Sequence, residues 1–241
     1  MERKRQALLH KLIEKKEKLL GYKILKELDL LYRMYYTVEK NFIDLMDYIK
    51  KCENELIFEI FENGSTADTV EMETLRLLHN YLSSIQSLID HIKRTQNNIN
   101  NIELNKYFEE EMNDFTKKNC VIFIKNFRNY IQHFCIPLLQ QEFIISRAEG
   151  VTIEAVRARD ADFKFNVFLN KKELLKWDKW NAQSKIYINK YIEKKELKTI
   201  ILEYHNINNI HYEKFWDKIN IIYKKDIDIV NKINNEIHQF I

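Results

Sequence analysis

The sequence predicts a mainly α-helical protein: a helical bundle with a long antiparallel helical hairpin and a small antiparallel β insert. The 241 residues include only 3 glycines and 1 proline, too few for a sandwich, a barrel or a doubly wound sheet, which need such residues at many turns. Apolar residues recur at helical intervals over long stretches, whereas strict alternation of apolar and polar residues is confined to one short segment. This length can enclose one large core, and we expect a single domain over residues 1–241.

A long helical hairpin is predicted in the first hundred residues. Apolar side chains over residues 24–56 are spaced alternately by four and three, the heptad pattern of a helix packed lengthwise against another helix. A second apolar run covers residues 75–92, and the polar segment 63–68 between them predicts a turn. The matched seams indicate two antiparallel helices, packed within the chain or across a dimer. Gly21 is expected to separate them from a charged first helix over residues 4–20.

A third long helix is predicted over residues 106–134, where Phe, Tyr, Met and Ile side chains recur at helical spacing. It completes a region of long helices over residues 1–135. Pro137, which has no backbone N–H to donate, ends it. The odd number of cysteines, Cys52, Cys120 and Cys135, and their apolar neighbours predict reduced thiols in the core of a cytosolic protein.

The period of the pattern then changes. Residues 142–170 are predicted to form a two- or three-stranded β meander, because Phe, Phe, Val and Leu alternate with other residues at positions 163–169. C-terminal helices are predicted over residues 171–241. Asn170 and Glu173 resemble a capping box at the start of the first of them, and the asparagines of residues 206–209 predict a break further on.

Charge and hydropathy narrow the range of functions. The formal net charge is +3, so any contact with nucleic acid must come from a local basic patch. The first residues lack the apolar segment of a signal peptide, and no apolar run approaches the length that spans a membrane. We therefore expect a soluble cytoplasmic protein with no membrane association.

The most chemically specific segment is Arg128-Asn129-Tyr130-Ile131-Gln132-His133. On a helix, Lys125, Arg128, Asn129, Gln132 and His133 share one polar arc, although Arg128 and His133 lie about 140° apart around the axis. Histidine can transfer a proton near neutral pH, and arginine offers a planar fork for phosphate oxygens. These groups suit RNA cleavage through the 2′-hydroxyl of the RNA itself, without a metal ion. A solvated helix face is the alternative interpretation of the arc.

An Arg-Asn-x-x-x-His segment late on a long helix resembles the Arg-x(4–6)-His motif of the HEPN superfamily. The resemblance implies a helical bundle that dimerises and joins two motif helices into one composite ribonuclease site. It also implies that Arg128 and His133 are catalytic and that Asn129 supports them. Many members act in toxin–antitoxin, abortive-infection or other antiviral defence systems. Some toxin members carry a tyrosine two residues after the histidine, as the target of an AMP-adding antitoxin; Cys135 stands there in this chain, which argues against that control.

Other residues admit two interpretations each. Lys125 and Gln132, together with Arg147, Arg157, Arg159 and Lys164 near the predicted strands, could contact an RNA backbone or form a solvated surface. Trp177 and Trp180 could stack on a base, but the favoured interpretation is that they anchor the C-terminal helices.

The prediction is therefore a HEPN-type endoribonuclease that is a homodimer, takes RNA as its substrate and is open to a regulatory protein partner. We expect no metal site and no cofactor, because the sequence has no metal-ligand spacing of Cys and His and no glycine-rich phosphate loop. The alternative is a non-catalytic helical interaction protein, such as a sensor, an adaptor or an antitoxin-like partner.

Overall fold

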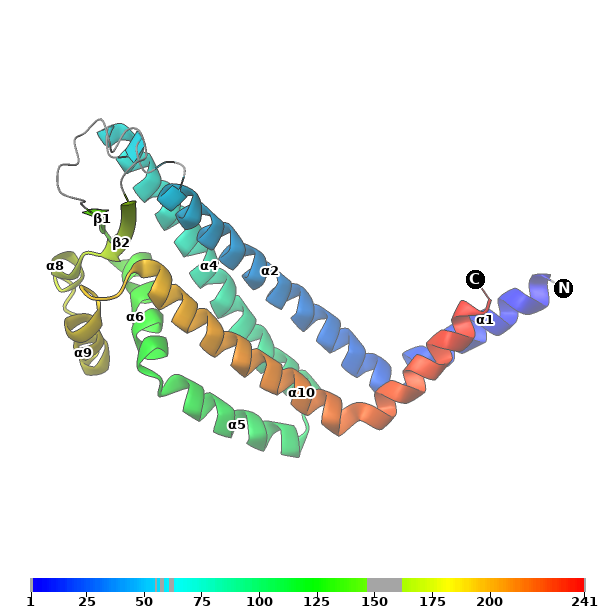
Figure 1. Cartoon of the computed structure of the whole chain (residues 1–241). Helices are drawn as coiled ribbons and strands as arrows, with labels where there is room; N and C mark the ends of the chain where they lie inside the picture. Colours follow the sequence, from blue (N-terminus) through cyan, green and yellow to red (C-terminus); the bar gives the residue numbers. More distant parts are fainter. Residues whose placement is uncertain (1, 55, 57–58, 61–62, 147–161, 241) are drawn as a thin grey trace. The chain divides into compact units, whose positions relative to one another are not determined.

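The structure is a computed structural model that describes residues 2–54, 56, 59–60, 63–146 and 162–240. Its elements (Figure 1) are, in chain order, α1 (Glu2–Glu17), α2 (Leu20–Asn54), α4 (Gly64–Ile99), α5 (Ile102–Thr116), α6 (Asn119–His133), β1 (Leu139–Ser146), β2 (Asp162–Leu169), α8 (Lys171–Leu174), α9 (Ala182–Tyr191) and α10 (Leu197–His238). The predicted fold class, a mainly helical bundle with a small β insert, is confirmed. Among the described residues, no helix is both long and apolar enough to cross a membrane.

Backbone contacts group the chain into two compact units that are each assembled from distant segments. Unit 1 comprises Met1–Thr37, Gln86–Asn113 and Asn209–Ile241, and unit 2 comprises Val38–Ile85 and Asp114–Asn208. The long helices α2, α4 and α10 each contribute residues to both units.

The predicted antiparallel hairpin is formed by α2 and α4. In unit 1, Asn98 near the end of α4 donates a hydrogen bond of 3.0 Å to Glu27 near the start of α2. In unit 2, the rings of Phe42 and Tyr81 pack with centroids 5.7 Å apart. The two seams supply fully buried side chains, as their heptad spacing predicts; these include Leu31, Val38, Leu45, Leu78 and Ile85.

The turn predicted at residues 63–68 is shorter than expected, because α4 already begins at Gly64. The side chain of Asn63 accepts a hydrogen bond of 3.1 Å from the backbone N–H of Ser65. Asn63 thereby satisfies one of the free N–H groups at the start of α4, so most of the polar segment becomes the first turns of the helix.

Gly21 does not separate the first two helices, contrary to the prediction. The first helix ends at Glu17 and α2 already includes Gly21. A Cβ atom at Gly21 would lie 2.2 Å from the backbone oxygen of Asp226 on α10. The glycine is therefore explained by the close approach of two helix backbones within unit 1.

The helix predicted over residues 106–134 is divided into α5 and α6. The division falls at the polar segment 116–119, where the backbone N–H of Lys118 donates a hydrogen bond of 3.2 Å to the carbonyl of Phe115 and forms a turn. Phe115 and Cys120 on either side are buried, whereas the residues between them are exposed. Polar residues of this kind carry no breaker signal, so packing of the flanking apolar residues decides the division.

The break predicted at residues 206–209 is also wrong, because α10 continues through it. Asn208 is buried, and its side chain donates a hydrogen bond of 2.7 Å to the carbonyl of Tyr204 within the helix. The chain turns earlier, between α9 and α10. There the backbone N–H groups of Lys194 and Lys195 both donate to the carbonyl of Tyr191 at 2.9 Å.

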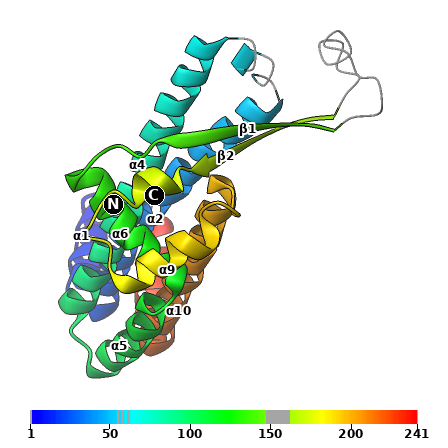
Figure 2. The same ribbon diagram turned by 90° about the vertical axis from the view of Figure 1, so that its left-hand side faces the viewer.

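The β insert is a two-stranded antiparallel ribbon (Figure 2) in which Leu139 pairs with Leu169 and Ser146 with Asp162. It starts three residues before the predicted insert because the start of α4 binds it: the backbone N–H of Leu139 donates to Glu71 at 2.8 Å. The predicted alternation is confirmed in β2, where Phe165, Val167 and Leu169 are buried. Residues 151–159, which could supply a third strand, lie outside the described residues.

Candidate active site on helix α6

Helix α6 is held by one apolar face, and its other residues are half-buried or exposed. Its buried residues are Cys120, Val121, Phe123, Ile124, Phe127 and Tyr130. They recur at intervals of three and four, the pattern of a helix with one face in a core. The motif side chains therefore sit on a well-anchored helix.

Aromatic packing against α9 and the segment before it fixes α6 within unit 2. The ring of Phe123 stacks on Tyr187 of α9 with centroids 4.7 Å apart, and Tyr130 stacks on Trp180 at 5.5 Å. Trp177 meets Trp180 edge to face at 4.9 Å, and both are buried. The indole N–H of Trp180 donates to the carbonyl of Leu174 at 2.6 Å. The favoured prediction that the tryptophans are anchors is therefore confirmed.

The predicted polar arc divides into an exposed part and a half-buried part. Lys125, Gln132 and His133 are exposed, whereas Arg128 and Asn129 are half-buried. His133 is the last residue of α6. Its imidazole is consequently accessible to a macromolecular substrate.

Arg128 is half-buried, and its charge acts on a residue of α10. Its Nε is buried and, among the described residues, has no hydrogen-bond partner. The pKa of the buried Tyr204 on α10 is raised mainly by burial, and a hydrogen bond with Asn208 and the positive charge of Arg128 partly offset this rise. Arg128 is therefore close enough to α10 for its charge to act on Tyr204, and it keeps a donor free.

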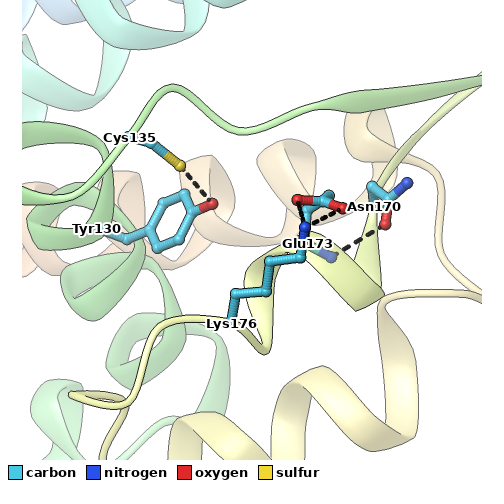
Figure 3. A network of polar contacts seen from close by, with 5 residues as sticks. All are labelled: Tyr130, Cys135, Asn170, Glu173 and Lys176. Atoms are coloured by element: carbon cyan, nitrogen blue, oxygen red, sulfur yellow. Dashed lines mark hydrogen bonds and ion pairs between the residues drawn. The ribbon is translucent and has the colours of Figure 1, made fainter.

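The end of α6 is closed by its own backbone and by Tyr130. The backbone N–H groups of Phe134 and Cys135 both donate to the carbonyl of Tyr130, at 2.9 and 3.3 Å. The Tyr130 hydroxyl and the Cys135 sulfur lie 2.9 Å apart (Figure 3).

Cys120 and Cys52 are buried as predicted, but Cys135 is exposed. The prediction of a core thiol is wrong for Cys135 because α6 ends before it.

The start of α8 lies near this helix end, as Figure 3 also shows. The Asn170 side chain accepts a hydrogen bond of 3.2 Å from the backbone N–H of Glu173, which confirms the predicted capping role of Asn170. The Glu173 side chain pairs with Lys176 at 2.7 Å instead of reaching back to the cap.

Apolar side chains are exposed on the segment that follows His133. Phe134, Ile136 and Leu138 are 49%, 67% and 52% exposed, and Met72 of α4 is 64% exposed. We call these four residues the apolar patch. A cavity of about 340 Å³ adjoins the patch and is lined by Met72, Leu75, Arg76, His79, Asn80, Ile131, Ile136 and Pro137. Such a surface is typical of a protein–protein contact.

The residues proposed to contact RNA outside α6 are only partly accounted for. Arg147, Arg157 and Arg159 lie outside the described residues. Lys164 is exposed on β2 and, with Lys198, lines a polar pocket of about 320 Å³. Lys198 is already paired there with Glu53 and Glu196, so the pocket is not a purely basic patch.

Tyr204 and His79 were not predicted to be neighbours of the motif helix. Tyr204 belongs to a continuous apolar face of α10 and has no distinguishing spacing. His79 is exposed on α4 and lines the cavity beside the apolar patch, a proximity that only the tertiary structure reveals. Over the part of the chain that the structure describes, no group of three or more His, Cys, Asp or Glu side chains could hold a metal ion.

The likeness to HEPN proteins depends on the motif and its helical setting, and it stays a prediction. No protein-family model matches this chain, and no curated protein or solved structure matches it either.

Proposed function

We propose that this protein is a metal-independent endoribonuclease of the HEPN type that acts in bacterial or phage-related defence. One observation carries the proposal. His133 is exposed at the end of α6, and Arg128, five residues earlier, keeps a buried guanidinium nitrogen without a hydrogen-bond partner among the described residues. A proton-transfer group and an unpaired cationic donor therefore share one anchored helix.

In the proposed reaction, the 2′-oxygen of the RNA attacks the adjacent phosphorus and the bond to the 5′-oxygen breaks. His133 takes the proton from the 2′-hydroxyl or gives one to the departing 5′-oxygen. Arg128 stabilises the negative charge on the phosphorane, and Asn129 orients the reacting groups. The products are a 2′,3′-cyclic phosphate and a 5′-hydroxyl. Since the RNA supplies its own nucleophile, no step assigns a role to a metal ion or a cofactor.

The site is proposed to form between two copies of the chain. Arg128 and His133 diverge by about 140° around the axis of α6, and the charge of Arg128 acts on Tyr204 of α10. A second motif helix across a two-fold axis would bring one copy's His133 to the other's Arg128. Three residues of the apolar patch, Phe134, Ile136 and Leu138, follow His133 in the chain, and the exposed area of the patch supports the proposal that another copy packs there.

The first experiment compares cells that express the wild type, Arg128→Ala, His133→Ala and the control His238→Ala at equal levels. His238 is also an exposed histidine but lies outside the motif, at the end of α10. We expect growth arrest and fragmented RNA with the wild type and with His238→Ala, and normal growth with intact RNA for both motif variants. RNA cleavage that persists in His133→Ala would contradict the proposal.

The composite nature of the site is tested by mixing the two inactive variants. In a heterodimer of Arg128→Ala and His133→Ala, one site loses both groups and the other keeps both. We expect a mixture in equal amounts to recover about a quarter of the wild-type activity, because half of the dimers are mixed and each has one intact site. A site contained within one chain would recover no activity on mixing.

The alternative is a non-catalytic interaction protein, and the apolar patch is the observation that favours it. A surface with four well-exposed large apolar residues beside a cavity is suited to another protein as well as to a second copy. Under this alternative, substitutions at Ile136 would abolish partner binding, while Arg128→Ala and His133→Ala would behave as the wild type.

A further inference from the structure

A groove of about 410 Å³ in unit 1 combines aromatic rings with carboxylates. It is lined by side chains of α2 and α10: Tyr32, Tyr35, Tyr212, Glu213, Trp216 and Asp217. The two tyrosines of α2 are three residues apart, and the α10 residues lie within two successive turns, so each set occupies one helix face. The volume falls in the range of small-molecule sites, and the groove shares no residue with the motif on α6.

Three aromatic rings of the groove pack against one another. Tyr35 and Tyr212 stack with centroids 4.0 Å apart and planes 5° from parallel, and Trp216 lies 5.9 Å from Tyr212. Burial, Tyr35 and Tyr32 all raise the pKa of Tyr212, so its phenol is neutral at physiological pH. Tyr32 is 53% exposed and lines the groove. Neutral aromatic rings offer their negative π faces to a cation.

The two carboxylates of the groove are uncompensated. Glu213 and Asp217 are exposed, and neither forms an ion pair or hydrogen bond within the described residues. The nearby lysines on α10 are paired elsewhere, since Lys214 contacts Glu111 at 2.9 Å and Lys218 contacts Glu103 at 2.6 Å. The groove therefore combines an apolar aromatic lining with negative charge that has no local partner.

We propose that this groove binds a free organic cation of the alkylated ammonium class. Such a cation buries methyl groups against aromatic rings, is attracted by their π faces, and pairs with carboxylates without needing hydrogen-bond acceptors of fixed geometry. A neutral ligand of the same shape would leave Glu213 and Asp217 uncompensated. An anion would be repelled by the same carboxylates. The assignment is independent of ribonuclease activity.

The test uses choline as the cationic probe and 3,3-dimethylbutan-1-ol as its neutral counterpart of the same shape. Isothermal titration calorimetry of the full chain should show saturable binding of choline in the millimolar range. The alcohol should show no saturable binding. Equal affinity for the two compounds, or no saturation by choline at concentrations well above millimolar, would overturn the proposal.

Two variants with matched controls connect the binding to the groove. Tyr32→Ala should weaken choline binding about fivefold, the loss expected for one cation–π contact. Tyr36→Ala removes a ring of equal exposure, 53%, on the same helix but outside the lining, and should leave binding unchanged. Circular dichroism checks that both variants keep the helical content of the wild type. Equal affinities of the wild type and Tyr32→Ala would contradict the assignment.

The charge contribution is tested by the double variant Glu213→Gln, Asp217→Asn, which keeps side-chain shape. It should weaken choline binding at least about threefold, and Asp228→Asn, an exposed carboxylate on α10 outside this groove, should have no effect. An unchanged affinity in the double variant would overturn the proposal, because these carboxylates are what selects a cation. Binding of a trimethyllysine peptide in the absence of choline binding would overturn the assignment to a free small molecule.

Discussion

A glycine inside a long helix usually weakens it, and Gly21 shows what can outweigh that cost. The side chain that Gly21 lacks would occupy the space of the Asp226 backbone. A backbone atom cannot move aside as the end of a flexible side chain can, so the two helices would have to separate.

Gly21→Ala should therefore destabilise the protein, although alanine favours helix formation. Overpacking of this kind costs about 1–3 kcal/mol, and the gain in helix propensity offsets about 1 kcal/mol of it. Urea denaturation should show a lower midpoint. Lys23→Ala, at an exposed position of the same helix, should stay within about 0.5 kcal/mol of the wild type. A Gly21→Ala variant as stable as the wild type would mean that α2 and α10 do not approach so closely.

His205 is a second residue whose surroundings determine a measurable property. It is buried on α10, its ring stacks on Phe42 at 3.6 Å, and its Nε2 lies 3.2 Å from Glu39. Burial lowers the pKa of His205 below its ordinary value of 6.5, and the opposing influence of Glu39 is smaller. The folded state therefore binds a proton at this site less readily than the unfolded state does.

The stability of the protein should consequently decrease as the pH falls below 6.5, because the unfolded chain takes up the proton first. Above pH 6.5 the histidine is neutral in both states and contributes no dependence. Denaturation measured from about pH 7 down to about pH 5 should show a steeper loss of stability for the wild type than for His205→Gln. Equal slopes for the wild type and His205→Gln would contradict this account of the buried histidine.

At the scale of elements, helix α6 has two faces with different roles. The face packed on α9 stabilises the fold, and the exposed part carries residues of the proposed site. Phe123 is fully buried and stacks on Tyr187. Lys125 and His133 are on the exposed part of the same helix. The two groups should respond differently to truncation.

Phe123→Ala should destabilise the protein by about 3–5 kcal/mol, the usual cost of removing a buried aromatic side chain. Lys125→Ala and His133→Ala should change stability by less than about 0.5 kcal/mol. Thermal denaturation followed by circular dichroism measures all three. A large loss of stability in His133→Ala would show that the histidine supports the fold, and its effect on RNA cleavage would no longer indicate a catalytic role.

The elements also show which parts of the fold the sequence could predict. The heptad seams of α2 and α4 and the alternation in β2 were identified because each repeats a period over many residues. The division between α5 and α6 and the continuity of α10 through Asn206–Asn209 were missed. Lysine favours a helix while threonine and asparagine disfavour it slightly, and none of them breaks a helix as glycine or proline does. The packing of their neighbours therefore decides the outcome.

The candidate site was predictable in part for the same reason. The position of His133 on an exposed helix face follows from helical periodicity. The approach of Arg128 to Tyr204 depends on where α10 packs, more than 70 residues further along the chain, and no local pattern encodes it. The aromatic groove is similarly assembled from α2 and α10, so neither sequence segment alone predicts it.

At the scale of the whole molecule, the apolar patch predicts how the protein associates. Ile136 is 67% exposed and lies shortly after the end of α6 at His133. Introducing a charge at this position would place it against apolar side chains in any complex that covers the patch. The folded monomer, in contrast, already exposes the position.

Ile136→Asp should therefore weaken self-association without unfolding the protein. Sedimentation velocity over a range of concentrations should show a dimer for the wild type and a shift toward monomer for the variant. Ile221→Asp is the matched control, because Ile221 is 70% exposed but lies on α10 in unit 1. A wild type that stays monomeric at all concentrations would contradict the dimer, and a loss of association in Ile221→Asp alone would move the interface away from α6.

The assembly of unit 1 from both ends of the chain also has a consequence for biosynthesis. Arg5 donates a hydrogen bond of 2.7 Å to the carbonyl of Phe240, a contact that spans 235 positions. Gly21 likewise meets Asp226. While the ribosome is still translating α10, the partners of α1 and of the start of α2 have not been synthesised. The apolar residues of α1 and of the start of α2 therefore stay exposed to solvent. Contacts of such high sequence separation form slowly, and the nascent chain is expected to depend on chaperones until the last segment has emerged.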